Sequence, residues 1–497
     1  MSQRNPYPCR RSRRTFLTDT GMGFTGLALS AMLGRDSSAR AEPLRSGTEV
    51  PLPVEPHFKP KAKSVIWIFL CGGVSHLESF DVKPELNKYA GKSIADTPYK
   101  AAIDPAKTDR IVLGGNPKHG NRKVIMPLNT GYATYGQSGL VVGDWFKNIG
   151  TCADDLAVVR SLWTVHNDHG AQLTFQTGRH PREGAHPTLG SWVSYGLGTG
   201  NANLPEFVVL GKPTGDCCGG TWTYGAGYLG PQYGGVHLEA DPRKPLPFIS
   251  SADPRATFEE QTANLSLIGK LNHLAGVDYP DDEELRARIK AYEMAFAMQR
   301  SIPETLELEK EDAATRAMYG IDQAHTKDFG TKCLVARRMV ERGVRFVQLF
   351  HGGGGGGDWD AHGKIKENHT KLAGQVDLPI AGLIRDLKRR GLLDETIVVF
   401  GTEFGRSPGA EGTGPAAGRD HHPNGFCAFM AGGGVKAGVQ HGSTDEIGFH
   451  AVDSPHYVTD LHATVLRLMG LDSHRLEVPG RKRLDMDHGR AIEGIIA

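Results

Sequence analysis

The sequence is poor in cysteine, nearly neutral, and without a hydrophobic run long enough to cross a membrane. Seven cysteines occur in 497 residues, with no Cys-x-x-Cys pair and no zinc-ribbon spacing, so a cysteine-based zinc site is not indicated. Cys217 and Cys218 are adjacent, and adjacent cysteines do not easily bridge each other. An oxidising compartment would permit a disulfide that the sequence does not demand. The formal net charge of +1 gives no reason to expect nucleic acid or an anionic membrane as a partner.

The N-terminus reads as an export signal. "RRSRRTFL" (Arg10 to Leu17) precedes the apolar stretch "GMGFTGLALSAMLG", and "ARA" ends at Ala41. The apolar stretch is too short and too rich in glycine for a membrane span. A basic region, a short apolar region and a small-residue cleavage site are typical of a signal peptide. Since "SRRTFL" resembles the twin-arginine signal, we expect residues 1–41 to direct export to the periplasm or beyond. The alternative is a disordered basic tail.

Continuous apolar runs recur along the rest of the chain, each ending at a polar or glycine-rich stretch. The runs are "SVIWIFLCGG" from Ser64, "LAVVRSLW" from Leu156, "PEFVVLG" from Pro205, "VRFVQLFHGG" from Val344, "TIVVFGTEFG" from Thr396 and "FCAFMAGGG" from Phe426. Such runs are typical of strands buried on both faces of a parallel sheet. Residues 42–60, rich in proline and polar residues, are expected to be a linker before this region.

Helical patterns lie between these runs. One apolar face repeats through Leu372, Val376, Ile380, Leu383, Ile384 and Leu387, and a second helix is expected over Val458 to Leu471. The span from about 250 to 342 is charged and is expected to form a mostly helical insertion. Alternating strands and helices predict one α/β domain over residues 61–497, a three-layer sandwich with a mainly parallel central sheet.

Histidines and carboxylates gather just after the predicted strands. The four clusters are His76 with Asp81, His166 with Asp168 and His169, Asp358 with Asp360 and His362, and Glu403 with Asp420, His421 and His422. The carboxyl ends of parallel strands share one edge of a sheet, and these ligand types suit Zn²⁺, Mn²⁺ or Fe. One cluster alone would more often be a set of helix caps or solvated loop residues. Four clusters predict a metal site.

Six glycines, Gly352 to Gly357, lead into Asp358, Asp360 and His362. Glycine lets the backbone turn sharply after the strand, with no side chain to crowd a metal. The alternative is a mobile surface loop. Arg406 and Arg419 follow neighbouring strands, where an arginine would either grip the oxyanion of a phosphate or sulfate or form a surface ion pair.

Three segments carry a resemblance to a known superfamily. "LPIAGLIRDLKRRGLLDETIVVFGTEFG" (Leu378 to Gly405) resembles the sulfatase and phosphodiesterase segment in which a helix leads to "GLLDNT" and a strand. "VTDLHATVLRLMGLD" (Val458 to Asp472) is similar to the "DLAPTLLDLAG" helix, and "TFQTGRHP" (Thr174 to Pro181) resembles "TGRYP". The order matches the alkaline-phosphatase-like superfamily. "GGxSHxxxFD", "WDxH", "EFGR" and "RDHxPN" resemble its branch called domain of unknown function 1501.

The resemblance implies a metal half-site that looks intact and a second half that departs from the pattern. Asp358 or Asp360, His362 and His421 match the first half, with Asp420 in reserve. In the second half Cys71 stands in place of an Asp, Glu403-Phe404 in place of Asp-His, and Asp168 in place of the Ser, Thr or Cys nucleophile. That half is therefore either rebuilt from His76, Asp81, Asp168, His169 and Glu403, or lost. Asp168 would be a metal ligand or a carboxylate nucleophile.

Two functions follow from the resemblance. The first is an exported metal-dependent hydrolase of a phosphate or sulfate ester in a small molecule or glycan, with Asp168, His169 and Arg406 as catalytic residues. It implies a divalent cation, Zn²⁺, Mn²⁺ or Ca²⁺, at one site, with a second site open. The second is a non-catalytic binding or envelope protein that keeps the fold and at most one structural metal. Buried carboxylates are costly to keep without a use, which favours the enzyme, whereas the missing nucleophile favours the binding protein.

Overall fold

A computed structural model describes residues 55–104, 119, 122–198, 201, 203–241, 257, 259–260, 263–264, 266–271, 298 and 301–497. The chain divides into Met1–Val50 and a compact unit over Pro51–Ala497. The expected signal peptide and most of the expected linker lie outside the described residues, as does most of the expected insertion between 250 and 300. At the start of the described part, Phe58 N donates to Gly470 O at 3.0 Å.

A sheet of nine strands runs through the described part of the larger unit. Its order is β12 (Val439–His441), β4 (Leu156–Trp163), β11 (Phe426–Ala431), β8 (Thr396–Thr402), β1 (Ser64–Leu70), β7 (Phe346–His351), β5 (Phe207–Leu210) and β6 (Val236–Leu238), with β15 (His456–Tyr457) beside β4. All six apolar runs predicted to be strands are strands of this sheet. The predicted α/β class with a mainly parallel sheet is confirmed.

Strand β11 alone among these nine runs against its neighbours. It pairs antiparallel with β4 and β8, whereas β1 pairs parallel with β7 and β8, and β5 pairs parallel with β6 and β7. Because two antiparallel steps cancel, β4 runs in the same direction as β8, β1 and β7. The segments that follow these four strands therefore emerge at one edge of the sheet, which is where the sequence places its histidines and carboxylates.

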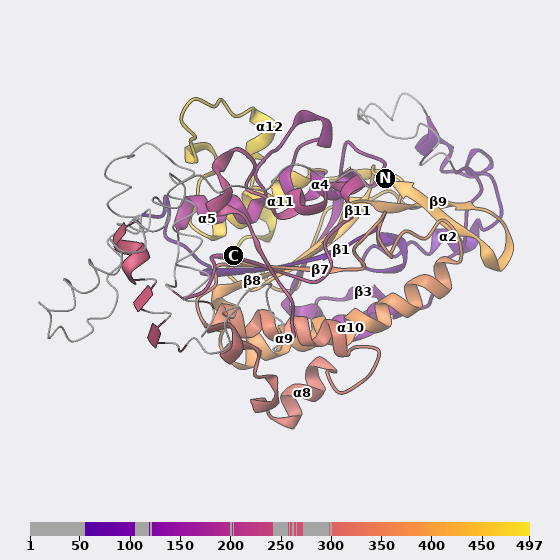
Figure 1. The fold of residues 1–497 in the computed structure, drawn as a ribbon. Coiled ribbons are helices and arrows are strands. Elements are labelled where there is room, and N and C mark those ends of the chain that lie inside the picture. The colour runs from indigo at the N-terminus through magenta and orange to yellow at the C-terminus, as the bar shows by residue number, and fades with distance from the viewer. Residues whose placement is uncertain are drawn as a thin grey trace, which may run out of the picture. The chain divides into compact units, whose positions relative to one another are not determined.

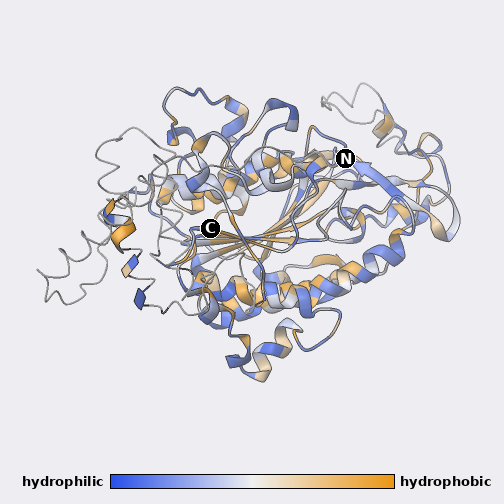
Figure 2. Ribbon diagram, in the orientation of Figure 1, coloured by the Kyte–Doolittle hydropathy of each residue, from blue (hydrophilic) through white to orange (hydrophobic). Residues whose placement is uncertain are grey.

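Alternate side chains of β1 build two cores, one on each face of the sheet. Ile66 and Ile68 pack into the core lined by α9 (Lys327–Glu341) and α10 (Ile365–Arg389). Trp67 and Phe69 pack into the core lined by α5 (Leu189–Leu197) and α11 (Val458–Leu468). Figure 1 shows α9 and α10 on one side of the sheet and α4 (Ala171–Thr177), α5 and α11 on the other. Figure 2 shows the apolar strands between helices whose outer faces are polar.

The two predicted helices are present, with different bounds. Helix α11 ends at Leu468, and α10 begins at Ile365, seven residues before the first residue of the predicted apolar face, Leu372. Of the expected insertion, α8 (Ala313–Tyr319) and α9 fall in the described residues. The remaining short elements are α2 (Glu85–Lys88), α3 (Lys147–Gly150), α12 (Asp485–His488), β2 (Tyr132–Tyr135) with β3 (Leu140–Gly143), and β13 (Ser443–Thr444) with β14 (Ala451–Asp453).

A separate two-stranded ribbon extends from the edge of the sheet where β8 ends. Strands β9 (Gly405–Glu411) and β10 (Gly418–His422) pair antiparallel, with His421 opposite Arg406. This ribbon carries Arg406, Arg419, Asp420 and His421, which were expected to lie just after strands of the sheet. Among the described residues, no helix combines the length and the apolar character needed to cross a membrane.

Candidate metal centre

Three histidines from three separate segments converge on the carboxylate of Asp360. Nε2 of His362 lies 3.2 Å and Nε2 of His421 3.1 Å from Asp360 Oδ1. Nε2 of His169 lies 3.1 Å from the second oxygen, Oδ2. The Nε2 atoms of His362 and His421 are 3.0 Å apart. We call Asp360, His169, His362 and His421 the histidine cluster.

Each histidine of the cluster is held from behind through Nδ1 by an oxygen atom. The partners are Glu403 Oε1 at 3.3 Å for His169, Glu411 Oε2 at 2.6 Å for His362, and the main-chain oxygen of Asn167 at 2.9 Å for His421. An oxygen acceptor requires a proton on Nδ1, so the neutral form of each ring has its lone pair on Nε2, facing the centre of the cluster. Carboxylates and carbonyls orient metal-binding histidines in the same way.

The glycine run positions Asp360 by close approach of backbone to backbone. Gly357 has φ +103° and a Cβ on it would lie 2.4 Å from Cys71 C. Gly72, after β1, has φ +120° and a Cβ there would lie 2.4 Å from Asp360 N. Both positions therefore require glycine. The run packs against the end of β1, and Trp359 N donates to Cys71 O at 3.0 Å.

Arg406 supports Asp360 from the buried side. Its side chain is fully buried, and Nη2 lies 2.8 Å from Asp360 Oδ1. Nε donates to Gly73 O at 2.8 Å and Nη1 to Arg419 O at 3.1 Å. This guanidinium ties together the end of β1, the glycine run and the ribbon. Arg406 therefore positions Asp360.

Glu403 closes the base of the cluster at the end of β8. Its side chain is fully buried, and its two oxygens accept from Gly72 N at 2.9 and 3.0 Å. Gln172 Nε2 lies 3.2 Å from Oε1, the oxygen that also contacts His169. Glu403 therefore acts on the cluster through His169, and within the described residues it belongs to no group spaced to share one ion.

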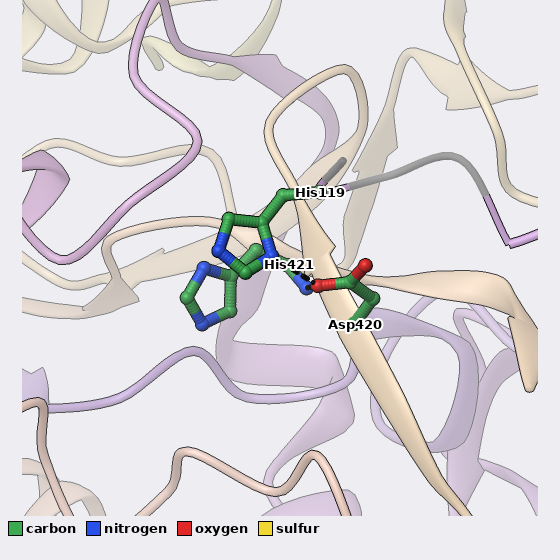
Figure 3. A group of neighbouring side chains, drawn as sticks. All are labelled: His119, Asp420 and His421. Atoms are coloured by element: carbon green, nitrogen blue, oxygen red, sulfur yellow. Dashed lines mark hydrogen bonds and ion pairs between the residues drawn. The ribbon is translucent and has the colours of Figure 1, made fainter. Parts of the chain in front are cut away.

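A second set of carboxylates adjoins the cluster along the ribbon. Asp420 Oδ1 lies 2.6 Å from His119 Nδ1, and Oδ2 lies 2.9 Å from Arg122 Nε. Arg122 Nη2 also pairs with Glu411. Figure 3 shows the His119 ring stacked against His421, with Asp420 beside both; the ring centroids are 4.4 Å apart. His119 with Asp420 and His421, and His362 with Glu411 and Asp420, have the spacing of metal ligands.

Asp168 lies beside the histidine cluster. It is half-buried, its Oδ1 accepts from His169 N at 2.8 Å, and it forms a metal-sized group with His169 and His421. The pKa of Asp168 is lowered: burial alone would raise it, but the His169 amide and the neighbouring histidines outweigh burial. Asp168 is therefore ionised at neutral pH.

Three of the residues expected to bind a metal lie outside the histidine cluster. His76 Nε2 bonds to Gly448 O at 2.9 Å, and Asp81 pairs with Lys83 at 2.9 Å. Asp358 directly follows the glycine run, and the carboxylate that contacts the three histidines is that of Asp360, two residues later. None of these three belongs to a metal-sized group within the described part of the chain. Arg419 is fully buried in an ion pair with Glu78.

The charges of the cluster are strongly coupled. Burial would raise the pKa of Asp360, but hydrogen bonds from the three histidines and the charge of Arg406 hold it well below its usual range. Burial lowers the pKa of His421 to about 4 despite its bond to Asp360. For His169, burial is outweighed by Asp360 and Glu403, which raise its pKa to about 9. Asp360 and Glu403 therefore favour a positive charge at the centre of the cluster.

Sequence reasoning missed four residues of this region, namely His119, Arg122, Asn167 and Glu411. Three are in segments without apolar periodicity, and Asn167 contributes only its main-chain oxygen. Glu411 lies five residues after Arg406 in β9, a strand that no apolar alternation marks in the sequence. The glycines and the proline of β9 are residues more typical of a turn than of a strand.

Comparison with known proteins identifies the family. The family model described as "Protein of unknown function (DUF1501)" matches residues 62–496, so the chain belongs to this family, as the sequence motifs indicated. The search of curated proteins found no match. Among solved structures, the PsFucS1 sulfatase from Pseudoalteromonas sp. is similar, with 14% identity, a TM-score of 0.35, and coverage of 88% of this chain and 71% of that one.

A second solved structure is the lipoteichoic acid synthase LtaP from Listeria monocytogenes, with 8% identity and a TM-score of 0.36, covering 88% of this chain and 79% of that one. These likenesses are weak, so the function of the chain rests on its own residues.

Proposed function

We propose that this member of the DUF1501 family is an exported, metal-dependent hydrolase of a phosphate or sulfate ester carried by a small molecule or glycan. The observation that supports this best is the histidine cluster, in which three imidazoles, each anchored at Nδ1, turn Nε2 toward one carboxylate. Three imidazole nitrogens gathered at one carboxylate form a ligand set that a divalent ion would bind once the rings are neutral.

The donor set fits a divalent cation. Imidazole nitrogen and carboxylate oxygen are the ligands that Zn²⁺ and Mn²⁺ accept, and the oxygens behind each ring supply the usual orienting partners. Asp360, His362 and His421 would hold the ion, and Asp168 and His169 form a second ligand group that shares His421. Such an ion would supply Lewis acidity toward the ester oxygens.

Other side chains of the site would position the metal ligands or act on the substrate. Arg406 and Glu403 are buried and hold Asp360 and His169 in place. Asp168 is an ionised carboxylate beside the cluster, either a further metal ligand or the group that attacks or activates a nucleophile. With a carboxylate in place of a Ser, Thr or Cys, no phosphoserine-type or formylglycine intermediate should form.

The alternative is a binding or envelope protein with one structural metal. Arg122 favours it, because its guanidinium already neutralises Asp420 and Glu411, which a second catalytic ion would need. Both proposals include a bound metal ion, but only the hydrolase would convert an ester substrate to product.

The test is a pair of histidine substitutions. His362→Ala removes one Nε2 from the cluster, and His474→Ala removes an exposed histidine distant in sequence from every cluster residue as the matched control. Metal content by elemental analysis and turnover of aryl phosphates and aryl sulfates are measured for both. We expect His362→Ala alone to lose both metal and turnover. Metal loss without any turnover in the parent protein supports the binding protein, and equal metal content in both variants refutes both proposals.

A further inference from the structure

Cys217 and Cys218 lie with their sulfur atoms almost in bonding contact. Their Sγ atoms are 2.7 Å apart, compared with about 2.05 Å in a disulfide bond. Both belong to the short 3₁₀ turn Asp216–Cys218 that follows β5. Cys217 is exposed, and Cys218 is buried with 2% of its surface accessible. An oxidant from solvent would therefore meet Cys217 first.

The two sulfurs share one acceptor, the main-chain oxygen of Gly355. Cys217 Sγ donates to it at 3.6 Å and Cys218 Sγ at 3.3 Å. Gly215 packs against the same residue, since a Cβ on it would lie 2.7 Å from Gly355 N. The cysteine turn therefore rests directly on the glycine run, five residues before Asp360.

The other side of the glycine run rests on the histidine cluster. Gln172 Nε2 donates to Gly356 O at 2.7 Å and also contacts Glu403 at 3.2 Å. A Cβ on Gly356 would lie 2.7 Å from His169 Nε2. The run is thus held between a thiol pair on one side and His169 on the other.

We propose that Cys217 and Cys218 are a redox modification site, which closes to a vicinal disulfide and thereby releases the carbonyl of Gly355. The inference does not depend on the proposed function. Gly219 and Gly220 follow the pair with φ +113° and +49°, and this left-handed backbone, which glycine adopts freely, gives the turn room to adjust as the ring closes.

The chemistry is thiol–disulfide exchange with a protein or low-molecular-weight disulfide. The thiolate of Cys217 attacks the oxidant and displaces one thiolate, which leaves a mixed disulfide on Cys217. The thiol of Cys218 then loses its proton and attacks Cys217 Sγ, displacing the second thiol. The two cysteines are oxidised, the oxidant is reduced to two thiols, and both protons leave with these products.

Slow closure is expected from the environment of the second sulfur. Burial, together with the adjacent Cys217 sulfur, raises the pKa of the Cys218 thiol well above its usual range. Thiolate is the nucleophile in exchange, so the second step should be rate-limiting. After closure neither sulfur carries a proton, and Gly355 O loses both donors.

The first experiment detects the bond. The full chain is equilibrated over a series of glutathione to glutathione disulfide ratios, acid-quenched, alkylated after denaturation, and digested for mass spectrometry. We expect oxidation to leave the Cys217–Cys218 peptide unalkylated and lighter by two hydrogen atoms, with full alkylation after reduction. Cys152→Ser, which removes a buried cysteine outside the pair, should behave like the parent. Full alkylation at every ratio, a stable glutathione adduct, or a bond to another cysteine would each overturn the proposal.

The second experiment tests the link to the glycine run. Hydrogen–deuterium exchange is followed in a peptide covering residues 352–360 for the oxidised and reduced protein. Loss of the donors to Gly355 O should make exchange in this peptide several-fold faster in the oxidised form. Cys217→Ser cannot form the bond and should exchange alike in both buffers. Equal exchange in oxidised and reduced parent protein would refute the release of Gly355.

Discussion

Arg406 Nη2 lies 2.8 Å from Asp360 Oδ1, and the same oxygen lies within 3.2 Å of Nε2 in both His362 and His421. One buried guanidinium thus fixes the carboxylate on which the histidines converge. Because the pKa of Asp360 is held far below its usual range, the carboxylate is ionised and paired with Arg406 at neutral pH. Asp360 is therefore the point at which fold and site are coupled.

Replacing Arg406 with lysine should destabilise the protein although the charge is kept. Lysine presents one nitrogen where Arg406 donates from three, to Gly73 O, Arg419 O and Asp360. Each buried acceptor left without a donor costs about 1–3 kcal/mol, so the free energy of unfolding should fall by several kcal/mol. Urea denaturation at pH 7 measures it. Arg316→Lys, at an exposed pair with Asp322, is the control, and a loss as small as the control's would contradict this role.

Acid should destabilise the protein partly through buried neutral histidines, of which His462 is one distant in sequence from the cluster. Burial lowers its pKa to about 4 from 6.5, and Nε2 bonds to Phe175 O at 2.8 Å. Between these values the unfolded chain binds the extra proton, so stability is complete above pH 6.5 and falls as the pH drops toward 4. His462→Gln removes this dependence.

The measurement for His462 is the loss of unfolding free energy between pH 7 and pH 4.5. It should be smaller in His462→Gln than in the parent by about 2–3 kcal/mol, from the size of the shift. The exposed His474→Gln should show the parent's loss. An unchanged pH dependence in His462→Gln would mean that this histidine is protonated in the folded state.

Export is expected to depend on the two arginines of "SRRTFL". Changing Arg13 and Arg14 together to lysine keeps the charge of the basic region and removes the feature that resembles the twin-arginine signal. We expect the precursor to accumulate in the cytoplasm, as measured by fractionation and immunoblotting. Changing Arg10 and Arg11 to lysine is the matched control and should leave export intact. Normal export of the Arg13/Arg14 double variant would refute the twin-arginine signal.

The sheet was predictable because burial on both faces leaves a simple mark. Ser64–Leu70 is apolar at almost every position, and it becomes the central strand β1, buried throughout. The ribbon of β9 and β10 leaves no such mark. It is held by arginines: Arg419 donates to Ser407 O and Pro408 O, both at 3.0 Å. A strand stabilised by side-chain bonds to its carbonyls has no hydrophobic period to detect.

The convergence of Asp360, His362, His421 and His169 followed from strand ends that meet at one edge. The meeting of parallel strand ends at one edge predicts which segments lie close together. It does not predict the direction of each side chain after its strand. His76 follows β1 more closely than Asp360 follows β7, yet it begins a 3₁₀ turn and bonds to Gly448 O. Orientation after a strand depends on backbone angles at Gly72 and Gly73, which the sequence permits without specifying.

The number of metal ions bound per chain should depend on Arg122. The histidine cluster offers a full set of ligands for one ion, whereas Asp420 and Glu411 are both engaged by Arg122. A guanidinium between two carboxylates supplies the charge that a second cation would bring and repels that cation. We therefore expect one tightly held ion per chain and a second that is weak, exchangeable or absent.

Replacing Arg122 with glutamine should convert the weak position into a stronger one. The change removes the positive charge and leaves His119, Asp420 and Glu411 in place around His362 and His421. Elemental analysis follows dialysis against a mild chelator at pH 7.5; the parent should retain one equivalent and Arg122→Gln should approach two. Arg316→Gln should retain one. Retention should fall below about pH 6 in every variant, because histidines must be deprotonated to bind metal. Two equivalents in the parent would show that Asp168 and His169 complete a second site, and a single equivalent in Arg122→Gln would show that Arg122 is not what excludes the second ion.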